Sequence, residues 1–328
     1  MLIDRFGRQI TYLRISVTDR CNFRCVYCMP SEGVPWLPPS SIMKYEEIAD
    51  VVRVAAKQGI REVRLTGGEP LVRKDLSELV SMIAAIEGIE DVSLTTNGIL
   101  LEHMAAPLAE AGLKRVNISL DTLDPEKFAR ITRGGSLARV WDGIRAVEEA
   151  GLKPIKINVV AMRGINENEL PALARLSMEH PWHIRFIEIM PILNQEPWGP
   201  GFPLPEQVYL SILEMMEILS PLGLQAEEST VGSGPASEYR LAGAAGKVGF
   251  ISPIGKKFCD QCNRLRLTSD GYLRPCLLKD GEVNILTAMR AGKPILPLLE
   301  KAVELKPEGH ELEIDDYPNG RCMRQIGG

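Results

Sequence analysis

Features that would place this chain in a membrane or on nucleic acid are missing from its 328 residues. No run of about 18 apolar residues occurs, so the sequence predicts no membrane-spanning helix. Acidic residues outnumber basic ones by 43 to 38, and the net charge of −5 argues against a large nucleic-acid-binding surface. The 45% hydrophobic and 25% charged residues are typical of a globular protein, and the length suggests about two domains.

A secretion signal is also missing. The first residues, MLIDRFGRQITYLRIS, alternate charged and apolar side chains and lack the apolar core of a signal peptide. Seven cysteines in such a chain indicate a reducing, cytoplasmic setting and metal ligation rather than disulfides.

The N-terminal cysteine set, Cys21, Cys25 and Cys28, lacks a fourth member. Structural zinc is almost always four-coordinate, so three thiols leave one coordination position for a substrate or cofactor. Short loop spacings such as C-x3-C-x2-C are typical of iron–sulfur clusters. The alternatives are a zinc knuckle that borrows a distant ligand, or three unconnected buried thiols.

The C-terminal cysteine set, Cys259, Cys262 and Cys276, has the spacing C-x2-C-x13-C and again lacks a fourth member. A zinc ribbon is the main alternative here, because C-x2-C is a common zinc half-site. Its fourth ligand would be Cys322, His310 or a non-protein group. Two clusters, each with one open iron, are a simpler explanation than two incomplete zinc sites.

Six short β-branched runs recur through the first two thirds of the chain, with amphipathic segments between several of them. This order predicts parallel strands joined by helical crossovers. We therefore expect an α/β fold, a partial (β/α)6 TIM-like barrel with a smaller C-terminal α+β cluster-binding region. The runs are residues 11–18, 62–68, 91–98, 115–121, 155–160 and 184–190.

Two of the intervening segments have the periodicity of helices. Residues 45–59 and 75–88 repeat apolar side chains at i, i+3, i+4 and i+7, which places them on one helix face. Gly59, Gly88 and Gly151 stand where such helices would end.

Polar or small residues end five of the apolar runs. In β/α barrels the C-terminal ends of the strands build the active site. One polar strand end is ordinary, but five predict a polar basin, and the N-terminal cysteine set would lie over it. These strand ends are residues 66–68, 95–97, Ser119, Asp121, Asn158 and Glu188.

The alternation of apolar runs and amphipathic segments ends after the sixth run. Residues 191–205 are rich in Pro and Gly and predict a linker or lid, followed by a helix near residues 207–219. Short β segments then include a hairpin that turns at Asp270-Gly271. We expect a barrel domain over residues 1–220 and a smaller second unit, which carries the C-terminal cysteine set, over residues 221–328.

Arg264 and Arg266 lie two apart on the first strand of this hairpin, so they project to the same side. Arginine binds phosphate in a bidentate manner, so two guanidiniums beside a cluster suit an anionic ligand. The alternative is a solvated strand face.

A family resemblance follows from these motifs. The N-terminal cysteine set with Tyr27 before its third cysteine resembles the radical S-adenosylmethionine (SAM) enzymes, as does GGEP at residues 67–70. The C-terminal cysteine set, RLR at residues 264–266 and the ending Gly327-Gly328 narrow the match. Over essentially its whole length the chain resembles the molybdenum cofactor biosynthesis protein A family, which are GTP 3′,8-cyclases.

The resemblance implies two [4Fe-4S] clusters. The open iron of the N-terminal cluster would chelate SAM, and one electron would split SAM into methionine and a 5′-deoxyadenosyl radical. This radical would take hydrogen from C3′ of GTP, which then closes onto C8 to give (8S)-3′,8-cyclo-7,8-dihydro-GTP. The open iron of the C-terminal cluster would hold the guanine.

The resemblance also assigns residues beyond the cysteines. Strand-borne Lys and Arg that point into a barrel are costly to bury unless they meet an anion, and a triphosphate would supply one. Alone, each could instead pair with an acid such as Glu69, Asp121 or Glu188. The implied SAM contacts are Tyr27, Gly68, Ser119 and Met190; the implied GTP contacts are Arg14, Arg64, Thr95, Lys156, Arg264 and Arg266.

The family implies further partners. These are an external one-electron donor and the next enzyme of the molybdenum cofactor pathway, and the family suggests a monomer or homodimer. Composition and net charge, as given above, predict neither a nucleic-acid nor a membrane partner. In the family the Gly-Gly end is thought to reach the active site near the arginines.

Three other functions fit parts of the sequence. A radical SAM peptide modifier would also have auxiliary cysteines, although usually more than three. A zinc-binding scaffold would have no chemistry, and an electron-transfer protein would have fully ligated clusters that respond to neither SAM nor GTP.

Overall fold

A computed structural model describes residues 1–190, 198–227, 234–255, 257–310, 321 and 323–327. Its centre is a run of six parallel strands in chain order, each hydrogen-bonded to the next. All six overlap the predicted runs, so the partial (β/α)6 barrel is confirmed. They are β1 (Tyr12–Ser16), β2 (Glu62–Thr66), β3 (Asp91–Thr96), β4 (Arg115–Ser119), β5 (Lys156–Ala161) and β6 (His183–Glu188).

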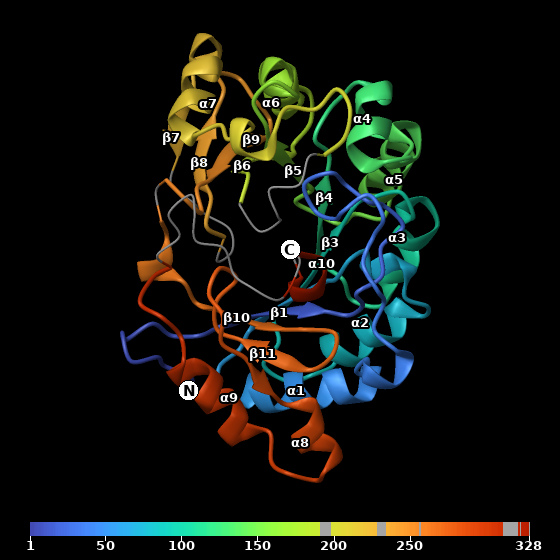
Figure 1. Cartoon of the computed structure of the whole chain (residues 1–328), viewed down its shortest axis with the longest axis vertical. Coiled ribbons are helices and arrows are strands. Elements are labelled where there is room, and N and C mark those ends of the chain that lie inside the picture. Colours follow the sequence, from blue (N-terminus) through green and yellow to red (C-terminus); the bar gives the residue numbers. More distant parts are fainter. Residues whose placement is uncertain (191–197, 228–233, 256, 311–320, 322, 328) are drawn as a thin grey trace.

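Helices follow each of these strands and lie outside the curved sheet (Figure 1). Their apolar faces pack against the strands, as the periodicity of residues 45–59 and 75–88 predicts. They are α1 (Tyr45–Lys57), α2 (Leu76–Ala84), α3 (Leu101–Glu110), α4 (Pro125–Thr132), α5 (Leu137–Glu149), α6 (Leu170–Glu179) and α7 (Ile212–Leu219).

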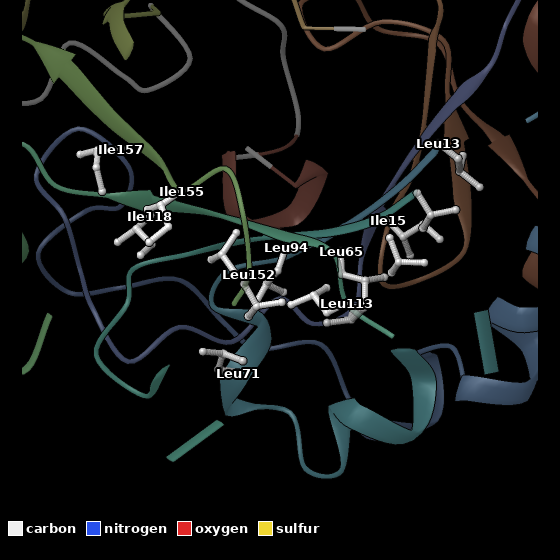
Figure 2. Close-up of a cluster of buried hydrophobic side chains, with 14 of the residues drawn as sticks. Leu13, Ile15, Leu65, Leu71, Leu94, Leu113, Ile118, Leu152, Ile155 and Ile157 are labelled. Carbon is white, nitrogen blue, oxygen red and sulfur yellow. The ribbon is translucent and has the colours of Figure 1, made fainter. Parts of the chain in front are cut away.

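The two faces of the sheet differ sharply in polarity. Successive side chains of a strand point to opposite faces. On β1, Leu13 and Ile15 are fully buried in the core beneath the helices, and Figure 2 shows Ile15 beside Leu65 of β2. Tyr12 and Arg14 line a cavity inside the barrel. The outer face therefore holds the fold together, and the inner face is left for polar chemistry.

C-terminal strands extend the sheet at both edges. The order is β12-β11-β10-β1-β2-β3-β4-β5-β6-β9-β8-β7, with β10 parallel to β1 and β9 parallel to β6. Strands from both sides of the predicted boundary at residue 220 thus share one sheet, and the boundary stays a prediction. These elements are β7 (Gln225–Glu227), β8 (Ser237–Arg240), β9 (Lys247–Ile251), β10 (Arg264–Leu267), β11 (Tyr272–Arg274), β12 (Val283–Asn284), α8 (Leu286–Arg290), α9 (Leu296–Glu304) and α10 (Met323–Ile326).

The predicted hairpin and two predicted helix ends are found in the structure, and one predicted helix begins later than expected. The hairpin at Asp270-Gly271 is confirmed, since β10 and β11 pair antiparallel. Gly59 and Gly151 directly follow the C-caps of α1 and α5 with positive φ, a common helix ending. The helix predicted near residues 207–219 begins only at Ile212, because the Ser211 hydroxyl accepts from the Glu214 amide and caps the helix there.

Two remaining expectations are tested only in part. In the described part of the chain, no helix has both the length and the apolar character to cross a membrane. Of the predicted linker or lid, residues 191–197 lie outside the described residues, whereas Trp198 is buried.

Candidate active site

A cavity of about 340 Å³ lies inside the barrel. Inner-face side chains of β1 to β6 and β10 line it, together with the loops of both cysteine sets. Every residue that the sequence predicts for cluster, SAM or GTP binding contributes to its wall. The structure therefore brings the predicted site residues together, while their individual roles stay predictions.

The N-terminal cysteine set lies on the loop after β1, pressed against the glycine loop after β2. A Cβ atom on Gly68 would lie 2.4 Å from the Arg20 carbonyl oxygen, so only glycine permits this approach. The Gly68 amide donates to the Thr18 carbonyl at 2.9 Å, and the Glu69 amide donates to the Arg20 carbonyl at 2.8 Å. The predicted SAM-binding glycine thus also holds the segment that leads into Cys21.

The far part of this loop is fixed to α4. The Val26 amide donates to the Ile131 carbonyl at 2.9 Å, and Arg133 Nη1 donates to the Met29 carbonyl at 2.7 Å. Val26 and Ile131 also belong to a small buried cluster with Trp198. The loop is therefore positioned from both sides before any ligand binds.

Tyr27 connects the same loop to β4. Its hydroxyl donates to Asp121 Oδ2 at 2.7 Å, and the Val160 amide donates to Asp121 Oδ1 at 2.8 Å. Burial raises the pKa of Asp121 to about 6, and burial and the Asp121 charge raise the pKa of Tyr27. The phenol therefore stays protonated, and its ring is held at the cavity wall.

The C-terminal cysteine set is assembled by the β10–β11 hairpin. Cys259 and Cys262 flank a short 3-10 turn before β10, and Cys276 follows β11 on the returning chain. Met190, a predicted SAM contact, packs beside Cys276 against Leu278. Burial alone would raise the pKa of Cys262, but the charges of Lys306 and Arg264 outweigh it and lower that pKa.

The thiols of both cysteine sets, and the N–H groups directed at them, fit iron–sulfur clusters. N–H groups directed at sulfur stabilise thiolates and tune clusters. Within the described ranges, no group of three His, Cys, Asp or Glu side chains is arranged to hold one metal ion. The N–H···S contacts are Phe23 N to Cys21 at 3.3 Å, Leu278 N to Cys276 at 3.4 Å, and Lys306 Nζ to Cys262 at 3.3 Å.

A row of three arginines crosses the inner face of the sheet. Arg14 on β1 is in register with Arg266 on β10 and with Arg64 on β2. Burial and then the Arg266 charge lower the pKa of Arg14, and burial followed by Arg264 lowers that of Arg266 to about 10. Adjacent like charges in a sheet are unfavourable, so this row is suited to an anion.

Lys156 on β5 extends the basic wall. Burial, followed by the charges of Arg185, Arg115 and Arg64, lowers the pKa of Lys156 to about 7. The Asn117 amide, oriented with its oxygen toward the guanidiniums, accepts from Arg64 Nη1 at 2.6 Å and from Arg185 Nη2 at 3.0 Å.

Glu69 and Asp121, two of the acids considered above as partners for these bases, accept other hydrogen bonds in the cavity wall. Glu69 accepts from the Thr96 hydroxyl and the Asn97 amide, both at 2.7 Å, and burial raises the pKa of Glu69 to about 7. Asp121 is held by Tyr27, as described above.

Glu188, a predicted member of the polar basin, does not line the cavity. Its place on β6 gives it the opposite parity to Arg185 and Ile187, so its side chain points out of the barrel. There it accepts from the Ser252 hydroxyl at 2.9 Å and the Gly255 amide at 3.1 Å, and anchors the loop after β9.

Sequence reasoning missed several cavity residues. Arg185 on β6 is 5% exposed and lines the same wall as Lys156, and its Nη2 donates to Asn158 at 2.7 Å. The signal was available, because Arg185 is a charge inside an otherwise apolar run. Other missed lining residues are Tyr12, Arg115, Asn117 and Phe258.

The C-terminal tail enters the barrel beside the arginine row. Arg266 Nη1 donates to the Gly327 carbonyl at 2.5 Å, and Figure 1 shows α10 within the curve of the sheet. Gly327 has φ +71°, and a Cβ there would lie 2.7 Å from Thr66 Cγ2. A glycine is therefore needed at this position.

Comparisons with known proteins agree with this architecture. The model of the Radical SAM superfamily matches residues 15–177, and that of Molybdenum Cofactor Synthesis C matches residues 182–312. The Streptococcus suis SuiB structure with its precursor peptide SuiA has a TM-score of 0.61 at 15% identity, over 91% of this chain and 66% of that chain. SuiB bound to S-adenosylmethionine has a TM-score of 0.56 at 15% identity, over 84% of this chain and 63% of the other. At these identities the likeness is one of fold.

Sequence relatives are much closer. The GTP 3′,8-cyclase of Pelotomaculum thermopropionicum is 50% identical over 99% of both chains, and that of Moorella thermoacetica is also 50% identical over 99% of both. With this similarity along its length, the chain belongs to the GTP 3′,8-cyclase family of radical SAM proteins.

Proposed function

We propose that this protein is a radical SAM GTP 3′,8-cyclase that makes (8S)-3′,8-cyclo-7,8-dihydro-GTP for molybdenum cofactor biosynthesis. The observation that carries the proposal is one cavity that joins two three-cysteine sets with a row of three arginines, of which Arg266 is buried and Arg14 and Arg64 are half-buried. Two [4Fe-4S] clusters and SAM supply the radical chemistry, in which hydrogen leaves C3′ of GTP and C3′ bonds to C8.

Residues near β1 and β2 would bind and orient SAM. Cys21, Cys25 and Cys28 would hold the first cluster, while the fixed loop at Gly68 offers backbone groups to the amino end of SAM. Tyr27, held by Asp121, and Ser119 and Met190 are the other proposed SAM contacts. Because both sides of the cysteine loop are fixed by hydrogen bonds, little ordering is needed when the cofactor binds.

The arginine row would bind the GTP phosphates. Arg14, Arg64 and Arg266 present guanidiniums from three adjacent strands, and Arg264, Lys156 and Thr95 complete the proposed contact set. Charge-assisted hydrogen bonds to phosphate are about twice as strong as neutral ones. The buried Thr95 Oγ1 has no hydrogen-bond partner among the described residues, which leaves it free to bind a ligand.

The C-terminal cysteine set would hold the second cluster and, through its open iron, the guanine. Phe258 lines this end of the cavity, and the Arg264 guanidinium lies 5.3 Å from its ring centroid and 5.8 Å from that of Tyr12. Aromatic faces around a guanidinium limit its movement, which suits a site that fixes a planar base.

The cellular setting follows from the chemistry. An external one-electron donor must reach the first cluster, and the product would pass to the next enzyme of the pathway, with the protein as a monomer or homodimer. We propose the cytoplasm as the compartment, because cluster assembly needs reduced thiols.

An anaerobic assay tests this function. The protein is reconstituted with iron and sulfide, mixed with SAM and dithionite, and 5′-deoxyadenosine is measured with GTP, with ATP and without nucleotide. Formation of 5′-deoxyadenosine that depends on GTP is expected. Cleavage indifferent to nucleotide would favour a peptide or other substrate, and loaded protein that cleaves no SAM would favour electron transfer.

A further inference from the structure

Lys306 follows α9 and is only 2% exposed. Its Nζ atom donates to the Arg264 carbonyl at 2.7 Å, to the Pro275 carbonyl at 2.9 Å and to Cys262 Sγ at 3.3 Å. An ammonium has three N–H donors, and these three acceptors use all of them. Burying this charge is costly unless a negative group compensates it.

The three acceptors surround the C-terminal cysteine set. Arg264 lies two residues after Cys262, and Pro275 directly precedes Cys276. One ammonium therefore connects the chain segments on both sides of the hairpin that carry two of the three proposed cluster ligands. Its sulfur contact is Cys262 Sγ, which would carry negative charge as a ligand of the proposed cluster.

Arg8, near the N-terminus, holds the segment that directly follows Lys306. Arg8 donates to the Pro307 carbonyl at 2.5 Å, to the Glu308 carbonyl at 2.9 Å and to the Cys259 carbonyl at 2.5 Å. Arg8 is held in turn by Asp4, with 2.6 Å between Arg8 Nε and Asp4 Oδ2 and both side chains buried. The third ligand, Cys259, is thus tied to the same segment that carries Lys306.

We propose that Lys306 is a positioning residue for the second cluster. Lys306 orients Cys262 and Cys276, and its positive charge raises the reduction potential of the cluster. The inference rests on the proposed function, in which these cysteines hold a [4Fe-4S] cluster. Reduction adds a negative charge to a cluster, so a buried cation at one of its sulfurs favours the reduced form. Net charge and hydrogen bonds to sulfur are known determinants of cluster potential.

The test uses the full-length chain with Cys21, Cys25 and Cys28 changed to Ala, so that only the second cluster contributes. Its midpoint potential is measured by an electron paramagnetic resonance redox titration, and its iron loss to a chelator is followed by absorbance. In Lys306→Met we expect a more negative potential and several-fold faster iron loss. Lys306→Arg keeps the charge and should keep the potential near that of the parent.

Lys301→Met is the matched control, because Lys301 is an exposed lysine on α9. It should leave both measurements unchanged, and thermal unfolding of each apo-protein reports any loss of folding. If Lys306→Met does not fold, Lys306→Gln replaces it: a more negative potential with faster iron loss supports the inference, and parent values for both measurements overturn it.

Equal potentials and equal iron loss in the parent and Lys306→Met overturn this inference alone. A parent chain that assembles no cluster overturns the proposed function and this inference with it.

Discussion

Arg14 lies directly opposite Arg266 on the neighbouring parallel strand, and both side chains line the cavity. The two residues are far apart in the chain, and they meet because β10 pairs with the outer edge of β1. Two guanidiniums side by side repel each other, and desolvation together with the Arg266 charge lowers the pKa of Arg14. The fold keeps this arrangement at a cost in stability, which a bound polyanion would offset.

Arg266→Ala should therefore weaken GTP binding while SAM binding stays near the wild-type value. Loss of a charge-assisted hydrogen bond costs about 1.5–3 kcal/mol, or about 10- to 100-fold in affinity. Isothermal titration calorimetry with each ligand measures both affinities. Equal weakening of the two would indicate a folding defect instead.

Cys25→Ala should abolish SAM cleavage, because the first cluster loses a ligand. Cys262→Ala should still permit SAM cleavage, but without coupling to GTP, because the second cluster serves the nucleotide. Quantifying 5′-deoxyadenosine and the cyclised nucleotide separates the two effects. Cyclisation that persists in Cys262→Ala would rule out the role of the second cluster in holding guanine.

Arg185, which the sequence did not single out, should contribute to GTP binding. Arg185→Met removes a guanidinium that burial, followed by the Arg64 charge, holds at a pKa of about 9. We expect GTP affinity to fall by about tenfold or more. Arg175→Met, on the exposed face of α6, is the control. Unchanged GTP affinity with reduced thermal stability would mean that Arg185 serves only Asn117 and Asn158.

GTP binding should depend on pH through Lys156. Its pKa of about 7 in the free protein means that the ammonium is neutralised as the pH rises through 7, while bound phosphates raise that pKa and favour proton uptake. The dissociation constant should be lowest below about pH 7 and rise by up to about tenfold per pH unit above it. Calorimetry between about pH 6 and about pH 8.5 measures this slope.

Lys156→Arg is the control for the pH dependence, since an arginine keeps its charge over this range. Its slope should report only the titration of GTP itself. A wild-type slope equal to that of Lys156→Arg would contradict the assignment.

Glu188→Gln should destabilise the fold without changing the active site. The carboxylate accepts from the loop after β9, and also from the Tyr209 hydroxyl and the amide of Ile212 at the start of α7. The side-chain amide of glutamine would present N–H donors to some of these groups. Leaving buried groups without partners costs about 1–3 kcal/mol in the free energy of unfolding, which chemical denaturation measures. Glu179→Gln, at an exposed position of α6, should change little. Weaker GTP binding in a well-folded Glu188→Gln variant would speak against the purely structural role.

Local chemistry in the sequence determined much of this protein. Cysteine spacing identified both candidate cluster sites, and β-branched runs located all six central strands, because ligand spacing and strand pattern are short-range properties. Polar residues at the ends of five runs predicted a polar basin in the barrel, and the family resemblance assigned Arg14 and Lys156 to it. The period-two rule correctly placed Arg264 and Arg266 on the same side.

The tertiary structure alone decided the relationships between distant segments. Strand parity turned Glu188 outward and Arg185 inward, which depends on which face of β6 the helices cover. Pairing of β10 with β1 set Arg266 beside Arg14, and the entry of the tail brought Gly327 to the same guanidinium. Lys306 and Arg8 had no recognisable motif, because their role arises only where both ends of the chain meet at the C-terminal cysteine set. Such contacts depend on long-range packing, which residue spacing along the chain does not encode.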